Sequence, residues 1–205
     1  MGNMLNKKMM TTLTKIAFVL CVVLGLASQS SAATITITGG NATWGTAANG
    51  MSGTPTAGDH VVIDGTNTFI IDASEVVAGG SNVVGNVTAA GAGVLTISTA
   101  TNAAVTTTIA SVDITGAGTI TQSVTDQTNR SIATTVTGAF KTGGALVMSD
   151  VNNDGATTSA ITVGGDIAIG GTTTIGHSTH NAVGNTATLT ANGASSVFTG
   201  AVTLN

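Results

Sequence analysis

One segment has the residue types of a calcium-binding loop. In Asp150-Val151-Asn152-Asn153-Asp154-Gly155, oxygen ligands stand at positions 1, 3 and 5, and a turn-forming glycine stands at position 6. Position 12, where a calcium loop carries a bidentate Glu, is Ile161. A corner rich in Asn, Asp and Gly is also an ordinary turn. The sequence therefore predicts at most a weak calcium site, with Asp150, Asn152 and Asp154 as its ligands.

Two histidines stand three residues apart, at His177 and His180. On a helical turn this spacing could bring two imidazoles to one metal ion. The surrounding residues are typical of a loop, however, and neither a cysteine nor a nearby acidic residue completes a ligand set. The pattern favours exposed loop histidines over a metal site, and we expect no cofactor other than calcium.

Threonines alternate with other residues in several short runs. A period of two places both hydroxyls on one face of a strand, so stacked strands could form a flat threonine array resembling those of ice-binding β-solenoids. Threonine is also a common choice for strands that face solvent. Because the pairs fall at different places within the repeat described below, we expect ordinary solvent-facing strands and keep ice binding as an alternative. The runs are Thr34-Thr36-Thr38, Thr106-Thr108, Thr119-Thr121, Thr135-Thr137, Thr172-Thr174 and Thr186-Thr188-Thr190.

Nine acidic residues could supply a catalytic carboxylate pair, as in the β-helical polysaccharide lyases and glycosidases. Beyond the N-terminal region, however, Arg130, Lys141 and three histidines are the groups available to neutralise an acidic sugar, and aromatic residues for sugar stacking are nearly absent. There is no Ser-His-Asp pattern, nucleophile elbow, P-loop or dinucleotide motif. The sequence predicts a non-enzymatic protein, with a carbohydrate-active enzyme as an alternative.

The composition indicates which elements position these residues. Of 205 residues, 7% are charged, 2% are aromatic and 28 are glycine. The chain consists largely of small, β-branched and turn-forming residues, which suit strands and tight corners. A helix bundle and a coiled coil are excluded, and an all-β fold is expected.

The N-terminus is typical of a secretory signal peptide. Three lysines precede an apolar run from Ile16 to Ala27, and the small residues Ser30 to Ala33 follow it. The run is too short to span a bilayer as a helix. We expect cleavage after Ala32 or Ala33, which removes the single cysteine, Cys21, and leaves no disulfide in the exported chain.

Without this leader the chain is acidic. Two basic residues, Arg130 and Lys141, stand against nine acidic ones, which gives a net charge of −7. So few cations cannot neutralise a phosphate backbone, which excludes nucleic-acid binding and argues against an anionic membrane surface as a partner. We also expect no membrane insertion after signal cleavage.

A repeat governs the second half of the chain. Five glycines, spaced 25 to 29 residues apart, each precede a short alternating strand, and further short strands lie between them: Gly93, Gly118, Gly144, Gly171 and Gly200. Units of this length that cannot bury a face alone are expected to stack. The repeat predicts a parallel β-helix, or β-solenoid, and an antiparallel β-sandwich is the alternative.

The stretch after the leader differs from the repeats. It holds the single Trp44 and the single Pro55, followed by Ala57-Gly58-Asp59-His60-Val61-Val62-Ile63. This run resembles the N-terminal entry of the large secreted β-helix surface proteins of bacteria, which include adhesins and autotransporter passengers. The resemblance implies a right-handed β-helix, an N-terminal cap and a location at the bacterial cell surface or outside the cell.

These observations predict a signal peptide at 1–32, a cap with the first coil at 33–80, and solenoid repeats at 81–205. The last repeat strand reaches Leu204 without a closing segment, so we expect its edge to contact either further coils of a longer chain or a second copy. The expected function is that of a secreted structural or adhesive protein, such as a stalk, fibre or adhesin segment. A surface glycan or a host receptor is the expected external partner.

Overall fold

The structure is a computed structural model that describes residues 32–44, 57–72, 81–99, 104–124, 131–150, 157–176 and 185–205. These residues belong almost entirely to one compact unit, Ala33–Asn205. Within the described ranges the regular elements are all strands. No helix among them is long and apolar enough to cross a membrane.

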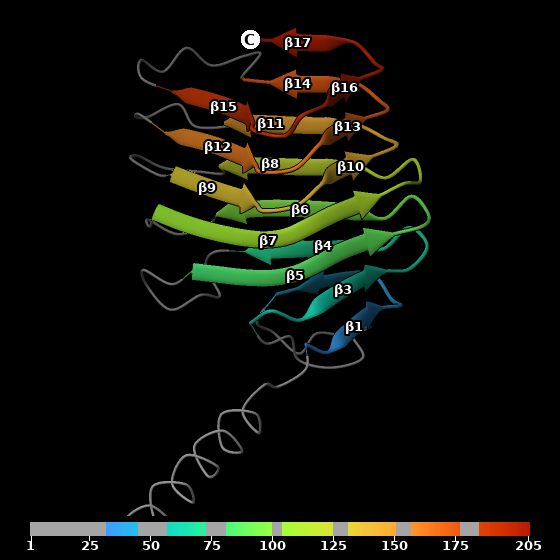
Figure 1. The fold of residues 1–205 in the computed structure, drawn as a ribbon. Coiled ribbons are helices and arrows are strands. Elements are labelled where there is room, and N and C mark those ends of the chain that lie inside the picture. Colours follow the sequence, from blue (N-terminus) through green and yellow to red (C-terminus); the bar gives the residue numbers. More distant parts are fainter. Residues whose placement is uncertain are drawn as a thin grey trace, which may run out of the picture. The chain divides into compact units, whose positions relative to one another are not determined.

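One side of the molecule is a seven-stranded parallel sheet, to which each successive coil contributes one strand (Figure 1). From β6 onward its strands carry the residues that follow the five repeat glycines, as the sequence predicts. They are β2 (Asn41–Thr43), β4 (Thr68–Asp72), β6 (Val94–Thr99), β8 (Ile120–Val124), β11 (Leu146–Asp150), β14 (Thr173–Ile175) and β17 (Val202–Leu204).

The opposite side is a ten-stranded sheet that divides into two rows. The first row comprises β1 (Thr34–Ile37), β3 (His60–Ile63), β5 (Ser81–Ala89), β7 (Ala104–Ile114), β10 (Phe140–Thr142), β13 (Ile167–Ile169) and β16 (Ser196–Phe198). The second row comprises β9 (Ser131–Val136), β12 (Thr158–Val163) and β15 (Thr186–Ala191), which continue the N-terminal half of β7.

Strand β7 joins the two rows in one bent strand. Its residues Ala104–Ile109 pair with β9, and Val112–Ile114 pair with β10. The sequence pattern predicts two separate strands here, Val105 to Ile109 and Val112 to Thr115, and this detail is wrong. The reason is local: two residues, 110–111, separate the two pairing segments of β7, whereas three residues, 137–139, including Gly138, separate β9 from β10, so the chain turns in the later coil and only bends in β7.

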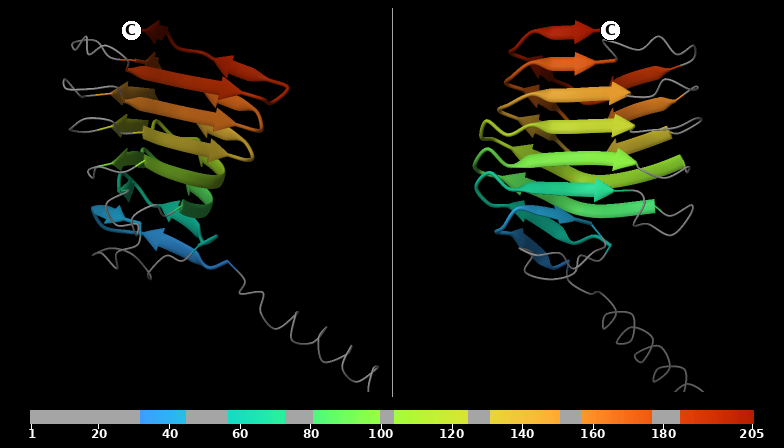
Figure 2. Two further views of the ribbon diagram at one scale, coloured as in Figure 1. Left: turned by 90° about the vertical axis from the view of Figure 1, so that its left-hand side faces the viewer. Right: turned by 180° about the vertical axis from the view of Figure 1, so that it is seen from behind.

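The sheets define a right-handed parallel β-solenoid, which confirms the predicted fold. Every strand pair in the described part of the chain is parallel, and this excludes the antiparallel sandwich. In Figure 1 the chain rises from bottom to top, the strands of the ten-stranded sheet in front run to the right, and those of the seven-stranded sheet behind run to the left. The right panel of Figure 2 shows the seven-stranded sheet from its own side. This is the hand that parallel crossovers almost always adopt.

The core consists of columns of apolar residues that repeat from coil to coil. Alternate residues of each strand point inward, so strands in register place their inward side chains directly above one another. One column of the ten-stranded sheet is Ile35, Val61, Val87, Val112, Phe140 and Ile167, all buried. One column of the seven-stranded sheet is Phe69, Leu95, Ile120 and Leu146, each 0% exposed.

The repeat glycines stack as a column at one corner. A Cβ atom added to Gly118 would overlap the carbonyl oxygen of Gly93, and one added to Gly144 would overlap that of Gly118. Gly171 and Gly200 stand in the same relation to the coil before them. The periodic glycines are therefore required because consecutive coils approach too closely there for any side chain.

A polar cluster interrupts the apolar core near the middle of the solenoid. The carboxamide of Gln122, on β8, is fully buried and crosses the core to β9 and β12. The Thr134 hydroxyl donates to its oxygen at 2.6 Å, and its Nε2 donates to the Ser159 hydroxyl at 3.1 Å and the Ala160 carbonyl at 3.0 Å. These bonds satisfy an amide that would otherwise be costly to bury.

The described part of the predicted cap segment forms regular coil strands. Strands β1 and β2 pair in parallel with β3 and β4, as later coils do. The Trp44 side chain is buried after β2, and its ring meets Phe69 edge-on, with centroids 6.1 Å apart. Residues 45–56 and 73–80 lie outside the described residues, so a distinct cap stays a prediction.

Candidate functional site

The predicted calcium loop falls largely outside the described residues. Asp150 is the last residue of β11, but its side chain is not described, and neither are Asn152 and Asp154. Among the residues that are described, no group of three or more His, Cys, Asp or Glu side chains could hold a metal ion. The weak calcium site stays a prediction, which thermal melting with calcium and with a chelator would test.

The histidine pair His177 and His180 also lies outside the described residues, as does Arg130. The third histidine, His60, has a structural role that the sequence analysis missed. Its Nδ1 accepts a hydrogen bond from the backbone N–H of Asn86 at 2.9 Å, and the Asn86 side chain accepts one from the Ser111 hydroxyl at 2.8 Å. These side chains link three consecutive coils on the outer side of the ten-stranded sheet.

The row of strands that contains β10 carries the charged residues of its sheet. Lys141 lies directly opposite Asp113 in the parallel register, and Asp166 lies just before β13. Opposite charges on neighbouring strands stabilise a sheet modestly. We call the outward residues of this row the charged face.

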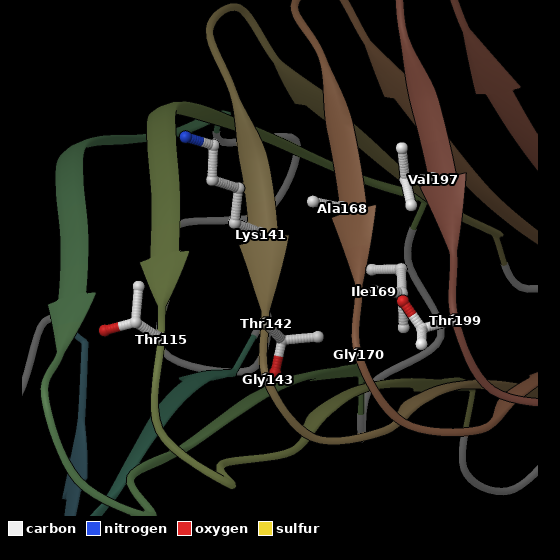
Figure 3. A pocket seen from close by; sticks show the side chains of 9 residues that line it. All are labelled: Thr115, Lys141, Thr142, Gly143, Ala168, Ile169, Gly170, Val197 and Thr199. Carbon is white, nitrogen blue, oxygen red and sulfur yellow. The ribbon is translucent and has the colours of Figure 1, made fainter.

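A hollow of about 260 Å³ opens on the charged face beside β10, β13 and β16 (Figure 3). Lys141 is the single ionisable residue among those that line it, and its side chain extends toward β7, away from Val197. Its other lining residues include Thr115 and Thr199, whose hydroxyls could bind a polar group. The lining lacks a carboxylate that could act with Lys141 in acid–base chemistry.

The other row of the ten-stranded sheet has a different outer surface. Its outward residues are threonine, serine and alanine on four consecutive strands, and no charged or aromatic residue stands among them. We call this surface the threonine face. It comprises Ala104, Thr106 and Thr108 of β7; Ser131, Ala133 and Thr135 of β9; Thr158, Ala160 and Thr162 of β12; and Thr186, Thr188 and Thr190 of β15.

The register aligns this face in rows across the strands. One row contains Thr108, Thr135, Thr162 and Thr190, and a second ends in Thr158 and Thr186. The expectation that the threonine pairs do not align is therefore wrong for this face. The distance of each threonine pair from its repeat glycine varies along the sequence, but corners of unequal length compensate for this variation and bring the threonines into register.

Comparison of the chain with models of protein families, with curated proteins and with solved structures gives no match. The class of protein is thus defined by the fold itself: a right-handed parallel β-solenoid with one charged face and one threonine face.

Proposed function

We propose that this protein is a secreted, non-enzymatic structural or adhesive element of the bacterial cell surface. The observation that carries the proposal is the stacking of the described strands from β1 to β17, each paired in parallel with strands of neighbouring coils. Such a column is stiff and grows by simple addition of coils, which suits a stalk or fibre that displays its faces.

The N-terminal sequence supports export. Lysines, a short apolar run and small residues at the expected cleavage position are the three parts of a secretory signal peptide. The resemblance of the segment from Trp44 to Ile63 to bacterial surface β-helices points to the same location. A surface glycan or a host receptor is the proposed external ligand.

The edge of the last coil supports assembly. Its residues Val202 and Leu204 are 51% and 74% exposed, although they continue columns that are buried in earlier coils. We propose that this edge stacks on another parallel coil, either in a second copy or in further coils of a longer chain.

Expression of the full chain in a bacterium, followed by fractionation and mass spectrometry, tests the proposal. We expect the exported product to begin at Ala33 or Thr34. Retention of the uncleaved chain inside the cell would contradict secretion. Electron microscopy of the exported protein should then show rods or filaments, whereas globular particles of irregular shape would contradict a structural role.

A further inference from the structure

The threonine face has the geometry of a regular two-dimensional grid. Neighbouring strands of a sheet lie about 4.8 Å apart, and alternate residues along one strand lie about 6.7 Å apart. The register extends this grid over four strands, from β7 to β15. Each threonine adds one hydroxyl and one methyl group to the grid.

The side chains of this grid are preorganised and available. Threonine is branched at Cβ and has few χ1 rotamers, so its hydroxyl and methyl groups keep their directions on a strand. Two of the eight threonines, Thr108 and Thr162, are half-buried, and the other six are exposed: Thr106, Thr135, Thr158, Thr186, Thr188 and Thr190. Within the described coils none of their hydroxyls bonds to another residue, which leaves them to water.

The chemistry of the face limits what it can bind. An ionic ligand would find no counter-charge, because the charged side chains of this sheet, such as Asp113 and Lys141, lie on the charged face. A sugar would find no aromatic side chain on which to stack, since the face contains threonine, serine and alanine alone. A flat array of neutral hydroxyls and methyls instead matches a ligand that is itself flat, neutral and periodic in hydrogen-bonding groups.

We propose that the threonine face binds the surface of crystalline ice. Ice presents a planar lattice of neutral donors and acceptors, and a rigid grid can order water in matching rows with little further loss of entropy. Each contact is weak, and affinity comes from many contacts made together by a surface that is already ordered. This inference goes beyond the proposed function, because it depends on the face alone and not on export or assembly.

The experiment measures thermal hysteresis and partition of the fluorescently labelled full chain into a growing ice hemisphere. The wild-type protein should show both. Thr135→Lys places a long charged side chain within the face and should abolish most of each signal. The matched control is Thr121→Lys, at an outward threonine of β8 in the seven-stranded sheet, which should retain both signals.

Circular dichroism melting of all three proteins establishes that the variants remain folded. Absence of ice partition by the folded wild-type protein would overturn the proposal, and so would an equal loss in Thr121→Lys and Thr135→Lys. A third outcome would also overturn it: the wild-type protein does not bind ice but forms oligomers, and Thr135→Lys is monomeric. The threonine face would then be a surface for self-association. The ice-binding experiment uses purified protein, so a negative result does not affect the tests of export and of rod shape.

Discussion

At the scale of single residues, Gln122 is the polar side chain on which the middle of the core depends. It is 0% exposed and holds hydroxyls from two strands on the opposite side of the coil, those of Thr134 and Ser159. A buried amide of this kind fixes which coils face one another, because a shifted register would leave several polar groups without partners.

Replacing Gln122 with Leu should lower the free energy of unfolding by about 1–3 kcal/mol, since it leaves the Thr134 hydroxyl and the Ala160 carbonyl without their partner. Urea denaturation followed by circular dichroism measures the loss. Adding Thr134→Val to Gln122→Leu should recover part of it, because both partners are then apolar. A double variant less stable than the sum of the single changes would contradict this account.

The stacked repeat glycines lead to a second prediction, which concerns stability. Gly144→Ala should be strongly destabilising, because the added Cβ would overlap the Gly118 carbonyl oxygen and force two coils apart. The matched control is Gly40→Ala. Gly40 has a φ of 66°, but the space around its Cβ position is open. Gly40→Ala should therefore lower the free energy of unfolding by backbone strain alone, about 1–2 kcal/mol.

Thermal melting of the two glycine variants compares the two effects. We expect Gly144→Ala to melt at a lower temperature than Gly40→Ala. The reverse order would mean that close packing of coils at this corner does not limit stability.

At the scale of elements, successive residues of each strand point alternately into the core and out toward solvent. In β6, Leu95 is fully buried in the column between Phe69 and Ile120, while Thr96 points outward. This alternation means that neighbouring residues in one strand should respond to substitution in opposite ways.

Leu95→Ala should therefore cost about 2–5 kcal/mol, because it leaves a cavity in a column that neighbouring coils cannot close. Thr96→Ala should change stability by less than about 0.5 kcal/mol. Denaturation in urea measures both. Leu95→Asp should prevent folding and export altogether, because it places an unpaired charge in the core; normal export of that variant would contradict the register.

At the scale of the whole molecule, the coils extend in one direction and their edges differ from their faces. The last coil exposes inward-type residues such as Leu204, whereas outward neighbours such as Thr203 are polar. The stacking proposed above would cover these inward-type side chains, so assembly should depend on them and not on their outward neighbours.

Light scattering over a concentration series tests this assembly. The wild-type protein should form species that grow with concentration, and Leu204→Lys should shift them toward the monomer, because the charge would enter a dry contact. Thr203→Lys is the matched control and should behave as the wild type. A monomer at every concentration of the wild type would contradict stacking between copies.

Much of the fold was predictable because its signals are local. Alternation of apolar and polar residues identifies strands such as Val94–Thr99, and the glycine period identifies coils that stack. The candidate sites were less predictable. The hydrogen bond between His60 and Asn86, and the contact of Gln122 with Ser159, join residues far apart in sequence, and no local pattern indicates them.

By itself, the sequence determined the all-β class and the side of each strand that faces the core, and its period of about 26 residues favoured a solenoid over a sandwich. The parallel pairing of the strands, which excludes the sandwich, is seen only in the tertiary structure because it joins residues of different coils. Only the tertiary structure decided which outward residues share a surface. That depends on how corners of different length, such as residues 110–111 in one coil and 137–139 in the next, bring strands into register. The threonine face exists because those corners compensate for unequal spacing along the chain.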